Sequence, residues 1–199
     1  MCCYLSRHGD HKDNVLTETG RDLAEKAAQW VLADIKAHGY KPGVKLISST
    51  PGRARETCDI YERVLRAGGI ALTRFEPVAA LDPAKGIGEF MKEADLAYGC
   101  GAVTFAWKLA SHGLFGLALP KDAETWEAVG ARSAAVIAEM EKDGSIAIAV
   151  CHGGTIEPMV DTLLGGSEPI LRDLPSAAVI AIGVNAETIT LADPSLHTK

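Results

Sequence analysis

The chain has 199 residues, of which 47% are hydrophobic and 23% are charged. This length and composition predict a single globular domain with a sizeable core over residues 1–199. The formal net charge of -6 argues against a general nucleic-acid binder, which would usually have a basic surface. No apolar run approaches the ~20 residues of a membrane helix. We therefore expect neither a nucleic-acid nor a membrane partner.

The location of the protein is predicted from its N-terminus and its cysteines. Met1–Ser6 is apolar but too short for a signal peptide, and no basic segment precedes it. The cysteines are odd in number and scattered, and the adjacent Cys2 and Cys3 lack metal-ligand spacing. We expect reduced thiols that pack as small hydrophobic side chains, and hence a cytoplasmic protein.

The first part of the chain alternates predicted strands and helices. A short strand is expected over residues 1–6, and a long helix over 17–37, where apolar residues recur at helical spacing. A second apolar strand follows over 44–48, then a helix over 53–67 and a third strand over 70–75.

The middle of the chain has a weaker pattern. Residues 89–98 are compatible with a helix, whereas 99–120 are rich in glycine and apolar residues without a clear period. We interpret the segment at about 76–120 as a region that carries an inserted cap or loop.

The last part of the chain again has a clear pattern. A helix is predicted over 123–141, a strand over 145–151, a helix over 155–164, and closing strands over 177–184 and 188–191. The apolar run of the 145–151 strand is typical of a strand buried on both faces. The alternation of strands and helices predicts an α/β fold, a three-layer sandwich with a mainly parallel sheet.

Three polar segments each follow a predicted strand. They span residues 5–10, 48–57 and 150–155. Open α/β sheets bind ligands at the carboxyl ends of their strands, so these segments are expected to meet at one site. Together they supply two histidines and two arginines, which are Arg7, His8, Arg53 and His152.

These four side chains suit phosphoryl chemistry. The arginine fork matches phosphate oxygens, and a helix that opens at Gly153 offers free N–H groups to an anion. A neutral imidazole attacks phosphorus through one nitrogen, provided that a hydrogen bond to the other nitrogen fixes the tautomer. A glycine carbonyl or a Ser/Thr hydroxyl would serve as that partner.

The same segments resemble the histidine phosphatase superfamily, also called the phosphoglycerate mutase-like fold. Arg7-His8-Gly9 matches its Arg-His-Gly motif, and His152-Gly153-Gly154 matches its late His-Gly motif. Ser48–Thr57 follows its Ser-Ser-Pro-Leu-x-Arg-Ala-x-x-Thr segment except at Thr50-Pro51, and Leu16–Arg21 matches Leu-Thr-Glu-x-Gly-Arg. The resemblance covers most of residues 1–75 and 123–165.

The resemblance implies a phosphatase in which His8 is the nucleophile and is transiently phosphorylated. It implies that the remaining catalytic residues of the phosphate pocket are Arg7, Arg53 and His152. Further contacts to substrate are implied at Gly9, Asn14 and Gly153. Arg55 lies about 200° around the helix from Arg53, so we expect it to face elsewhere.

The general acid is the least defined part of the prediction. Many members of the superfamily carry a glutamate in a Leu-x-Glu segment, where this chain has Leu81-Asp82-Pro83. Asp82 is therefore the first candidate, although it equally suits a turn before proline. Glu89 is the second candidate. Glu157 is the third, and it also suits the first turn of a helix, where it would complement the dipole.

No metal and no cofactor are expected, because arginine and histidine supply the positive charge of the pocket. The other histidines show no ligand spacing and are interpreted as surface or packing residues; they are His11, His38, His112 and His197.

The substrate is left open between two classes. The short chain, Asp10 and the missing Leu-x-Glu favour a phosphohistidine protein, whereas the 76–120 segment favours a small phosphomonoester. The alternatives are a phosphoglycerate mutase-type phosphotransferase and an inactive phospho-ligand-binding member. The sequence predicts no particular oligomeric state.

Overall fold

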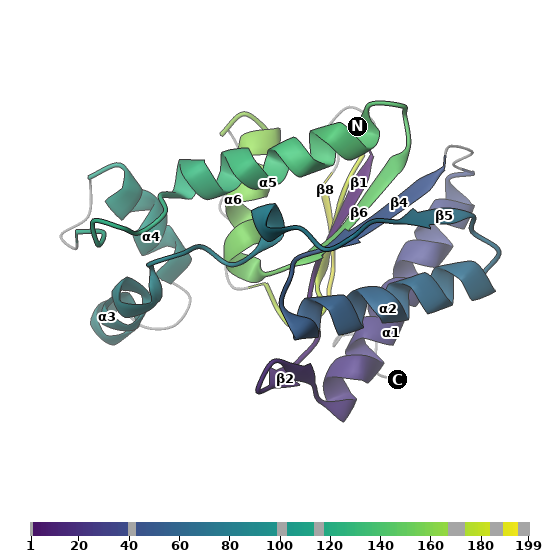
Figure 1. Cartoon of the computed structure of the whole chain (residues 1–199), viewed down its shortest axis with the longest axis horizontal. Helices are drawn as coiled ribbons and strands as arrows, with labels where there is room; N and C mark the ends of the chain where they lie inside the picture. Colours follow the sequence, from purple (N-terminus) through teal and green to yellow (C-terminus); the bar gives the residue numbers. More distant parts are fainter. Residues whose placement is uncertain are drawn as a thin grey trace.

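A six-stranded sheet forms the centre of the computed structural model, which describes residues 2–39, 43–98, 103–113, 118–166, 174–183 and 189–194. The strand order is β5-β4-β6-β1-β7-β8. The first four strands run parallel, while β7 and β8 are antiparallel to their neighbours. The predicted mainly parallel sheet is therefore confirmed (Figure 1). The strands are β1 Cys3–Arg7, β4 Val44–Ser48, β5 Leu72–Arg74, β6 Ile146–Cys151, β7 Val179–Ile182 and β8 Ile189–Ala192.

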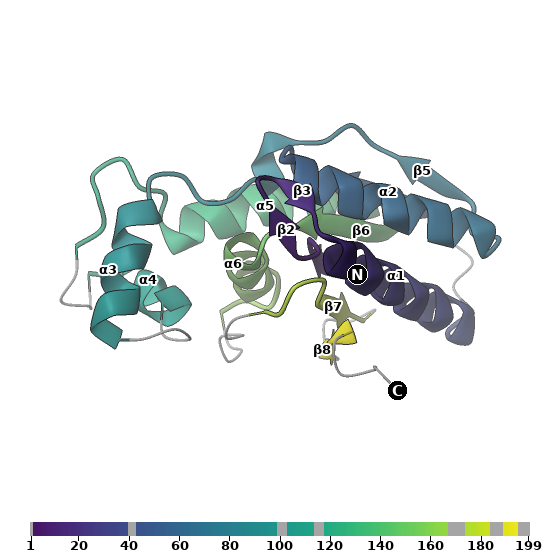
Figure 2. The ribbon, with the colours of Figure 1, turned by 90° about the horizontal axis from the view of Figure 1, so that it is seen from below.

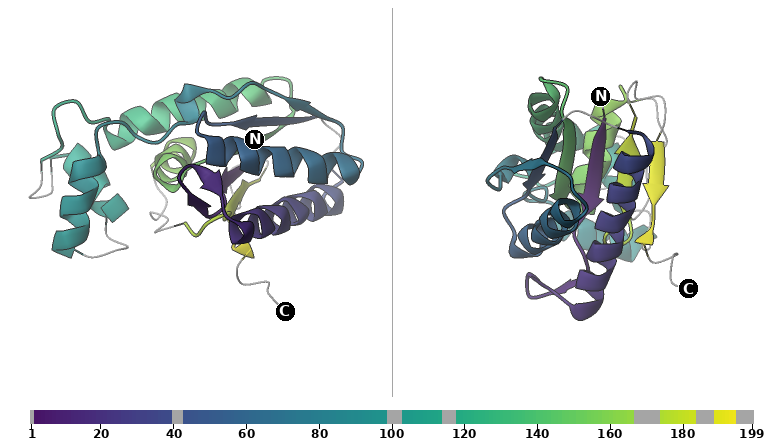
Figure 3. Two further views of the ribbon diagram at one scale, coloured as in Figure 1. Left: turned by 60° about the horizontal axis from the view of Figure 1, so that its bottom comes forward. Right: turned by 90° about the vertical axis from the view of Figure 1, so that its right-hand side faces the viewer.

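Helices cover both faces of this sheet and complete the three layers (Figures 1 and 3). The helices α1 and α2 pack on one face, and α5 and α6 pack on the other. Strand β6 is apolar on both faces, which explains why helices cover both. Its alternate residues pack under α1 and α2 (Ile146, Ile148 and Val150) or under α5 and α6 (Ala147, Ala149 and Cys151). These four helices are α1 Glu18–Ala37, α2 Gly52–Ala67, α5 Trp126–Glu141 and α6 Gly153–Leu163.

Two helices stand away from the sheet (Figure 2). They are α3 Gly88–Tyr98 and α4 Val103–Ser111. An apolar cluster joins them to the start of α5, and in it Trp107 and Trp126 meet edge to face at 5.2 Å between ring centroids. The helix predicted at 89–98 is confirmed, whereas α4 falls in a stretch whose period the sequence leaves unclear.

Two helix starts differ from the prediction. Helix α5 begins at Trp126 rather than at residue 123, because the Thr125 side chain accepts a hydrogen bond from the Ala128 N–H and caps the helix there. Helix α6 begins at Gly153, with His152 as its N-cap, rather than at residue 155. Pro158 is therefore the sixth residue of α6, not a first-turn residue, and it cannot donate to the Gly154 carbonyl.

A β-hairpin and a 3-10 turn are two further short elements of the fold. The hairpin pairs β2 His11–Lys12 with β3 Val15–Leu16, and the turn η1 spans Ala79–Leu81. Neither element is predicted from the sequence. Within the described residues no helix is both long and apolar enough to cross a membrane.

Candidate active site

A cavity of about 360 Å³ opens where β1, β4 and β6 end, and Arg7, His8, Arg53, His152 and Gly153 line it. The register places Arg7 opposite Cys151 and Ser48 opposite Val150, so the three strand ends are level. Backbone hydrogen bonds from His8 to Cys151 and from Ser49 to Val150 continue the sheet into the loops. The structure thus brings together the four charged or imidazole side chains that the sequence singled out.

His8 is held as a neutral imidazole with one nitrogen directed to Arg53. Its Nδ1 lies 2.8 Å from the Gly9 carbonyl oxygen and donates to it, so Nε2 carries the lone pair. The Arg53 Nε–H donates to that Nε2 at 3.0 Å. Burial, followed by the charges of Arg53 and Arg7, lowers the pKa of His8 to about 4 against an opposing effect of the Gly9 hydrogen bond.

His152, which also lines the cavity, is held in a defined tautomer. Its Nδ1 lies 3.2 Å from Nη2 of Arg53, and because arginine only donates, Nδ1 accepts. The Nε2–H then donates to the Ser49 hydroxyl at 2.9 Å. Burial lowers the pKa of His152, and the neighbouring His8 and the arginines lower it further.

Arg53 is the centre of this network. It lies in the first turn of α2, and besides the two histidines it donates through Nη1 to Oδ1 of Asn14 at 2.9 Å. Asn14 is thus tied to the site through Arg53. Arg55 is exposed, as expected from its position on the helix. Arg7 donates from Nη1 to the Leu174 carbonyl oxygen, which lies at the cavity wall.

The loop after β1 is fixed by close backbone packing. The Gly9 N–H donates to the Thr57 hydroxyl at 3.1 Å, and that hydroxyl donates to the Arg53 carbonyl oxygen at 2.8 Å. A Cβ on Gly9 would lie 2.3 Å from the Gly20 carbonyl oxygen, so only glycine fits at this crossing. Gly9 therefore holds the loop from behind, whereas Gly153 faces the cavity.

The three candidate acids occupy different surroundings. Both carboxylate oxygens of Asp82 accept hydrogen bonds from Thr50, from its N–H and from its hydroxyl, each at 2.7 Å. Glu89 is exposed on α3 and forms an ion pair with Lys92 at 2.8 Å. Glu157 is 4% exposed and lines the cavity from the fifth residue of α6, beyond the first turn in which it was expected.

His11 lies in the cavity wall, although the sequence reading interpreted it as a surface or packing residue. Its ring centroid is 4.8 Å from that of His8, and the two rings are nearly perpendicular. The hairpin that carries His11 turns through Asp13 and Asn14, which have φ values of 50° and 68°. Two such residues make a tight two-residue hairpin, a signal that the sequence contains but that is weak without glycine.

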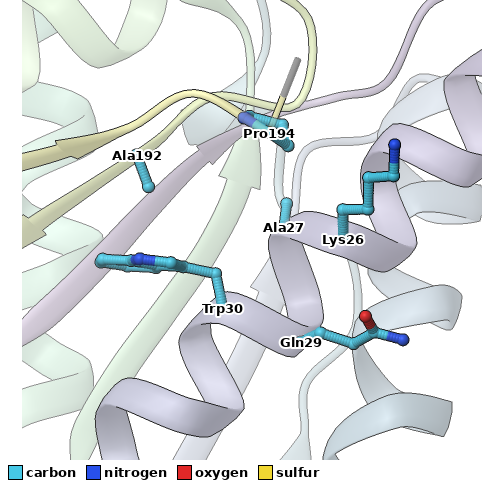
Figure 4. Close-up of a pocket in the computed structure, with 6 residues that line it drawn as sticks. All are labelled: Lys26, Ala27, Gln29, Trp30, Ala192 and Pro194. Atoms are coloured by element: carbon cyan, nitrogen blue, oxygen red, sulfur yellow. The ribbon is translucent and has the colours of Figure 1, made fainter. Parts of the chain in front are cut away.

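A second hollow of about 360 Å³ lies between α1 and β8 (Figure 4). It is lined by Lys26, Ala27, Gln29, Trp30, Ala192 and Pro194. Lys26 is the one ionisable side chain among these, and the close-up shows its amine and the Gln29 amide directed away from Trp30. Neither histidine nor arginine is among these residues, whereas both line the first cavity, so the first cavity is the candidate active site.

Solved structures share this fold over nearly the whole chain. A mycobacterial glucosyl-3-phosphoglycerate phosphatase is 21% identical with a TM-score of 0.62, and 96% of each chain is covered. A phosphoglycerate mutase from Bacillus anthracis is 20% identical with a TM-score of 0.60, covering 97% of this chain and 92% of that one. The protein histidine phosphatase SixA is 16% identical with a TM-score of 0.51, and both chains are fully covered.

The chain therefore shares the α/β fold of these structures, the phosphoglycerate mutase-like fold that the sequence predicts. No family model matches the chain, and no curated protein matches it in sequence.

Proposed function

We propose that the protein is a phosphatase that hydrolyses a phosphomonoester or a phosphohistidine through a phosphohistidine intermediate on His8. One observation carries this proposal. His8 lines the cavity with its Nδ1–H held by the Gly9 carbonyl oxygen, so Nε2 carries the lone pair, which accepts a hydrogen bond from Arg53 until a substrate takes over that donor. An imidazole fixed in this tautomer is ready to attack phosphorus without first losing a proton.

The neighbouring groups suit the charge that develops during such an attack. In the free site the Arg53 guanidinium donates to His8 and His152, so its N–H groups already point toward the position of an incoming phosphoryl group. Arg7 lines the same cavity. Substrate oxygens would take over these donors, which then stabilise the transition state in a largely buried site.

The structural neighbours support a phosphatase and leave two substrate classes in place. The mycobacterial neighbour is a phosphatase of glucosyl-3-phosphoglycerate, and SixA is a protein histidine phosphatase. Met91 of α3 and Thr104 of α4 line the cavity. We propose that α3 and α4 form the cap of a single-domain enzyme, an arrangement that favours a small phosphorylated substrate over a protein surface.

The decisive test replaces the nucleophile. We expect His8→Ala to abolish turnover rather than raise KM, because no other side chain can form the phosphoryl bond at that position. Wild-type protein quenched during turnover of a labelled phosphomonoester or phosphohistidine peptide should carry an acid-labile, base-stable phosphoryl group. His112→Ala, at an exposed histidine paired with Glu127, is the matched control and should behave as wild type.

Each outcome separates the candidate functions. An adduct followed by release of inorganic phosphate supports the phosphatase. An adduct whose phosphoryl group passes only to an added phosphoglycerate would identify a mutase-type phosphotransferase instead. Tight binding of phosphorylated compounds with no adduct would identify an inactive phospho-ligand-binding protein. Turnover by His8→Ala near the wild-type rate would overturn the assignment of His8.

A further inference from the structure

Release of an alkoxide from phosphorus requires a proton donor at the cavity. The surroundings of Asp82, the first candidate from the sequence, do not suit that role. Asp82 uses both oxygens to bind Thr50 and does not line the cavity. The Asp82 main chain is also fixed, because its carbonyl oxygen accepts from the Thr155 hydroxyl and from Arg132, each at 3.0 Å. These contacts suit a residue that shapes the loop after β4 more than one that exchanges protons with a substrate.

His11 differs from Asp82 in lining the cavity. It is exposed, so it can exchange protons with solvent, and it also lines the cavity that holds His8. Its ring centroid lies 4.8 Å from that of His8, closer than the 5.0 Å that separates His8 from His152. A phosphoryl group on His8 would therefore have an imidazole beside it that is committed to no other partner in the catalytic network described above.

The hairpin holds His11 in a fixed place. The Leu16 N–H donates to the Glu56 carboxylate at 2.8 Å, and the Thr17 N–H donates to the Asp10 carbonyl oxygen at 3.0 Å. The turn is anchored at its other end, where Asn14 accepts from Arg53. A side chain on such a braced two-stranded ribbon is positioned well enough to take part in a reaction.

We propose that His11 is a catalytic residue, the general acid that protonates the leaving oxygen and then the general base that activates water. This inference rests on the proposed phosphatase function. It assigns to an imidazole the role for which the sequence first suggested Asp82.

The two steps balance as follows. His8 Nε2 forms a bond to phosphorus, the bond from phosphorus to the ester oxygen breaks, and that oxygen takes the proton of the His11 imidazolium. Water then attacks phosphorus while neutral His11 takes its proton, and the electron pair of the breaking P–N bond returns to His8 Nε2. Inorganic phosphate leaves, and His11 is again an imidazolium.

The charges around His11 explain how substrate would prepare it. Burial and then Arg53 lower the pKa of His11 in the free site, with a smaller lowering by Arg7 and an opposing effect of Asp10. A phosphate dianion bound between the arginines adds two negative charges beside the ring and favours the imidazolium. Arg7, His8, Asp10, Arg53 and His152 interact electrostatically with His11, and Glu157 lines the same cavity.

The test compares a substrate that needs a proton with one that does not. We expect His11→Gln to lower kcat/KM for an alkyl phosphate by about 10²–10⁴-fold, the usual worth of general acid catalysis. The loss for an aryl phosphate such as p-nitrophenyl phosphate should be less than about tenfold, because its leaving group departs as a stable anion. Added imidazole should restore part of the alkyl phosphate activity to His11→Ala.

Lys12→Ala is the matched control, because Lys12 follows His11 in the same strand, is exposed and does not line the cavity. It should keep wild-type rates on both substrates. Equal losses on alkyl and aryl phosphates in His11→Gln would overturn the inference and leave His11 a phosphate-binding group. A large loss confined to alkyl phosphate in Asp82→Asn or Glu157→Gln, with His11→Gln unaffected, would give the role to that carboxylate.

The inference and the proposed function fail in different ways. Absence of a phosphoryl adduct in the wild-type protein would defeat the proposed function. An adduct on wild type, together with no alkyl-selective loss in His11→Gln, would defeat only the assignment of His11.

Discussion

Arg53 joins three parts of the chain that are far apart in sequence. It donates to His8 at the end of β1, to His152 at the start of α6 and to Asn14 in the hairpin turn. The sequence identifies Arg53 and both histidines, because each follows a recognisable strand. It does not identify His11, because the position of His11 depends on a two-residue turn without glycine, for which a sequence contains little information.

The pKa of His8 gives the site a defined effect on stability. Burial lowers this pKa to about 4 in the folded chain from 6.5, so between these values the unfolded chain binds a proton that the folded chain does not. Stability therefore rises with pH in this window. The stability that the folded chain has with His8 neutral is fully present above pH 6.5 and is lost as the pH falls toward 4. His152, whose pKa is also lowered, acts in the same direction.

We expect His8→Gln to weaken this dependence. Between about pH 7.5 and pH 5 the free energy of unfolding of wild type should fall by roughly 2 kcal/mol more than that of the variant. Urea unfolding at the two pH values measures the difference. His38→Gln, at an exposed histidine on the far end of α1, serves as the control and should retain the wild-type dependence. Parallel curves for wild type and His8→Gln would contradict the burial argument.

At the scale of elements, the site depends on how closely the hairpin approaches α1. A Cβ on Gly20, the third residue of α1, would lie 2.0 Å from the Asp10 carbonyl oxygen. Conversely, a Cβ on Gly9, which precedes Asp10, would lie 2.3 Å from the Gly20 carbonyl oxygen. The Leu-Thr-Glu-x-Gly-Arg match located Gly20 in the sequence, but its purpose, a backbone crossing that places the hairpin beside the site, became visible only in three dimensions.

We expect Gly20→Ala to destabilise the protein by about 1–3 kcal/mol, the usual cost of overpacking, despite a gain in helix propensity of up to about 1 kcal/mol. Activity should fall as well, because Asp10 must move and His11 follows it in the chain. Gly88→Ala is the control, since a Cβ at the first residue of α3 meets nothing within 4 Å. Thermal unfolding and kcat/KM of both variants test this, and a Gly20→Ala protein as stable as wild type would rule out the close crossing.

At the scale of the whole molecule, the alternation of strands and helices was enough to predict the three layers. Three of the parallel strands, β1, β4 and β6, end beside the cavity, so the same alternation also placed the site. The α3–α4 region was less predictable. It packs in a small cluster around Trp107 and Trp126 rather than on the sheet, so its apolar positions do not follow the pattern of a sheet-covering helix.

The charge of the cavity differs in sign from the net charge of the molecule. The chain has a formal net charge of -6, yet the cavity is lined by Arg7 and Arg53 at the carboxyl ends of the strands and by the N-terminus of α6. Glu157 also lines the cavity, but two arginines and the helix N-terminus oppose it. A mainly positive cavity with low-dielectric walls concentrates a negatively charged substrate, even on a molecule whose net charge repels it. Protein groups alone can thus supply the positive charge that phosphoryl transfer needs.

We therefore expect activity that is independent of divalent metals and sensitive to vanadate. In the described parts of the chain, no three His, Cys, Asp or Glu side chains are grouped as metal ligands would be. Phosphate release should be unchanged after dialysis against EDTA, and loss of activity that added Mg²⁺ or Zn²⁺ restores would contradict this.

Vanadate should compete with substrate, because it adopts the five-coordinate geometry that His8 and the arginine donors would stabilise during transfer. Because His8 would bond to the vanadium directly, the dissociation constant of vanadate should rise sharply in His8→Ala, measured by vanadate protection against thermal unfolding. It should stay near the wild-type value in His112→Ala.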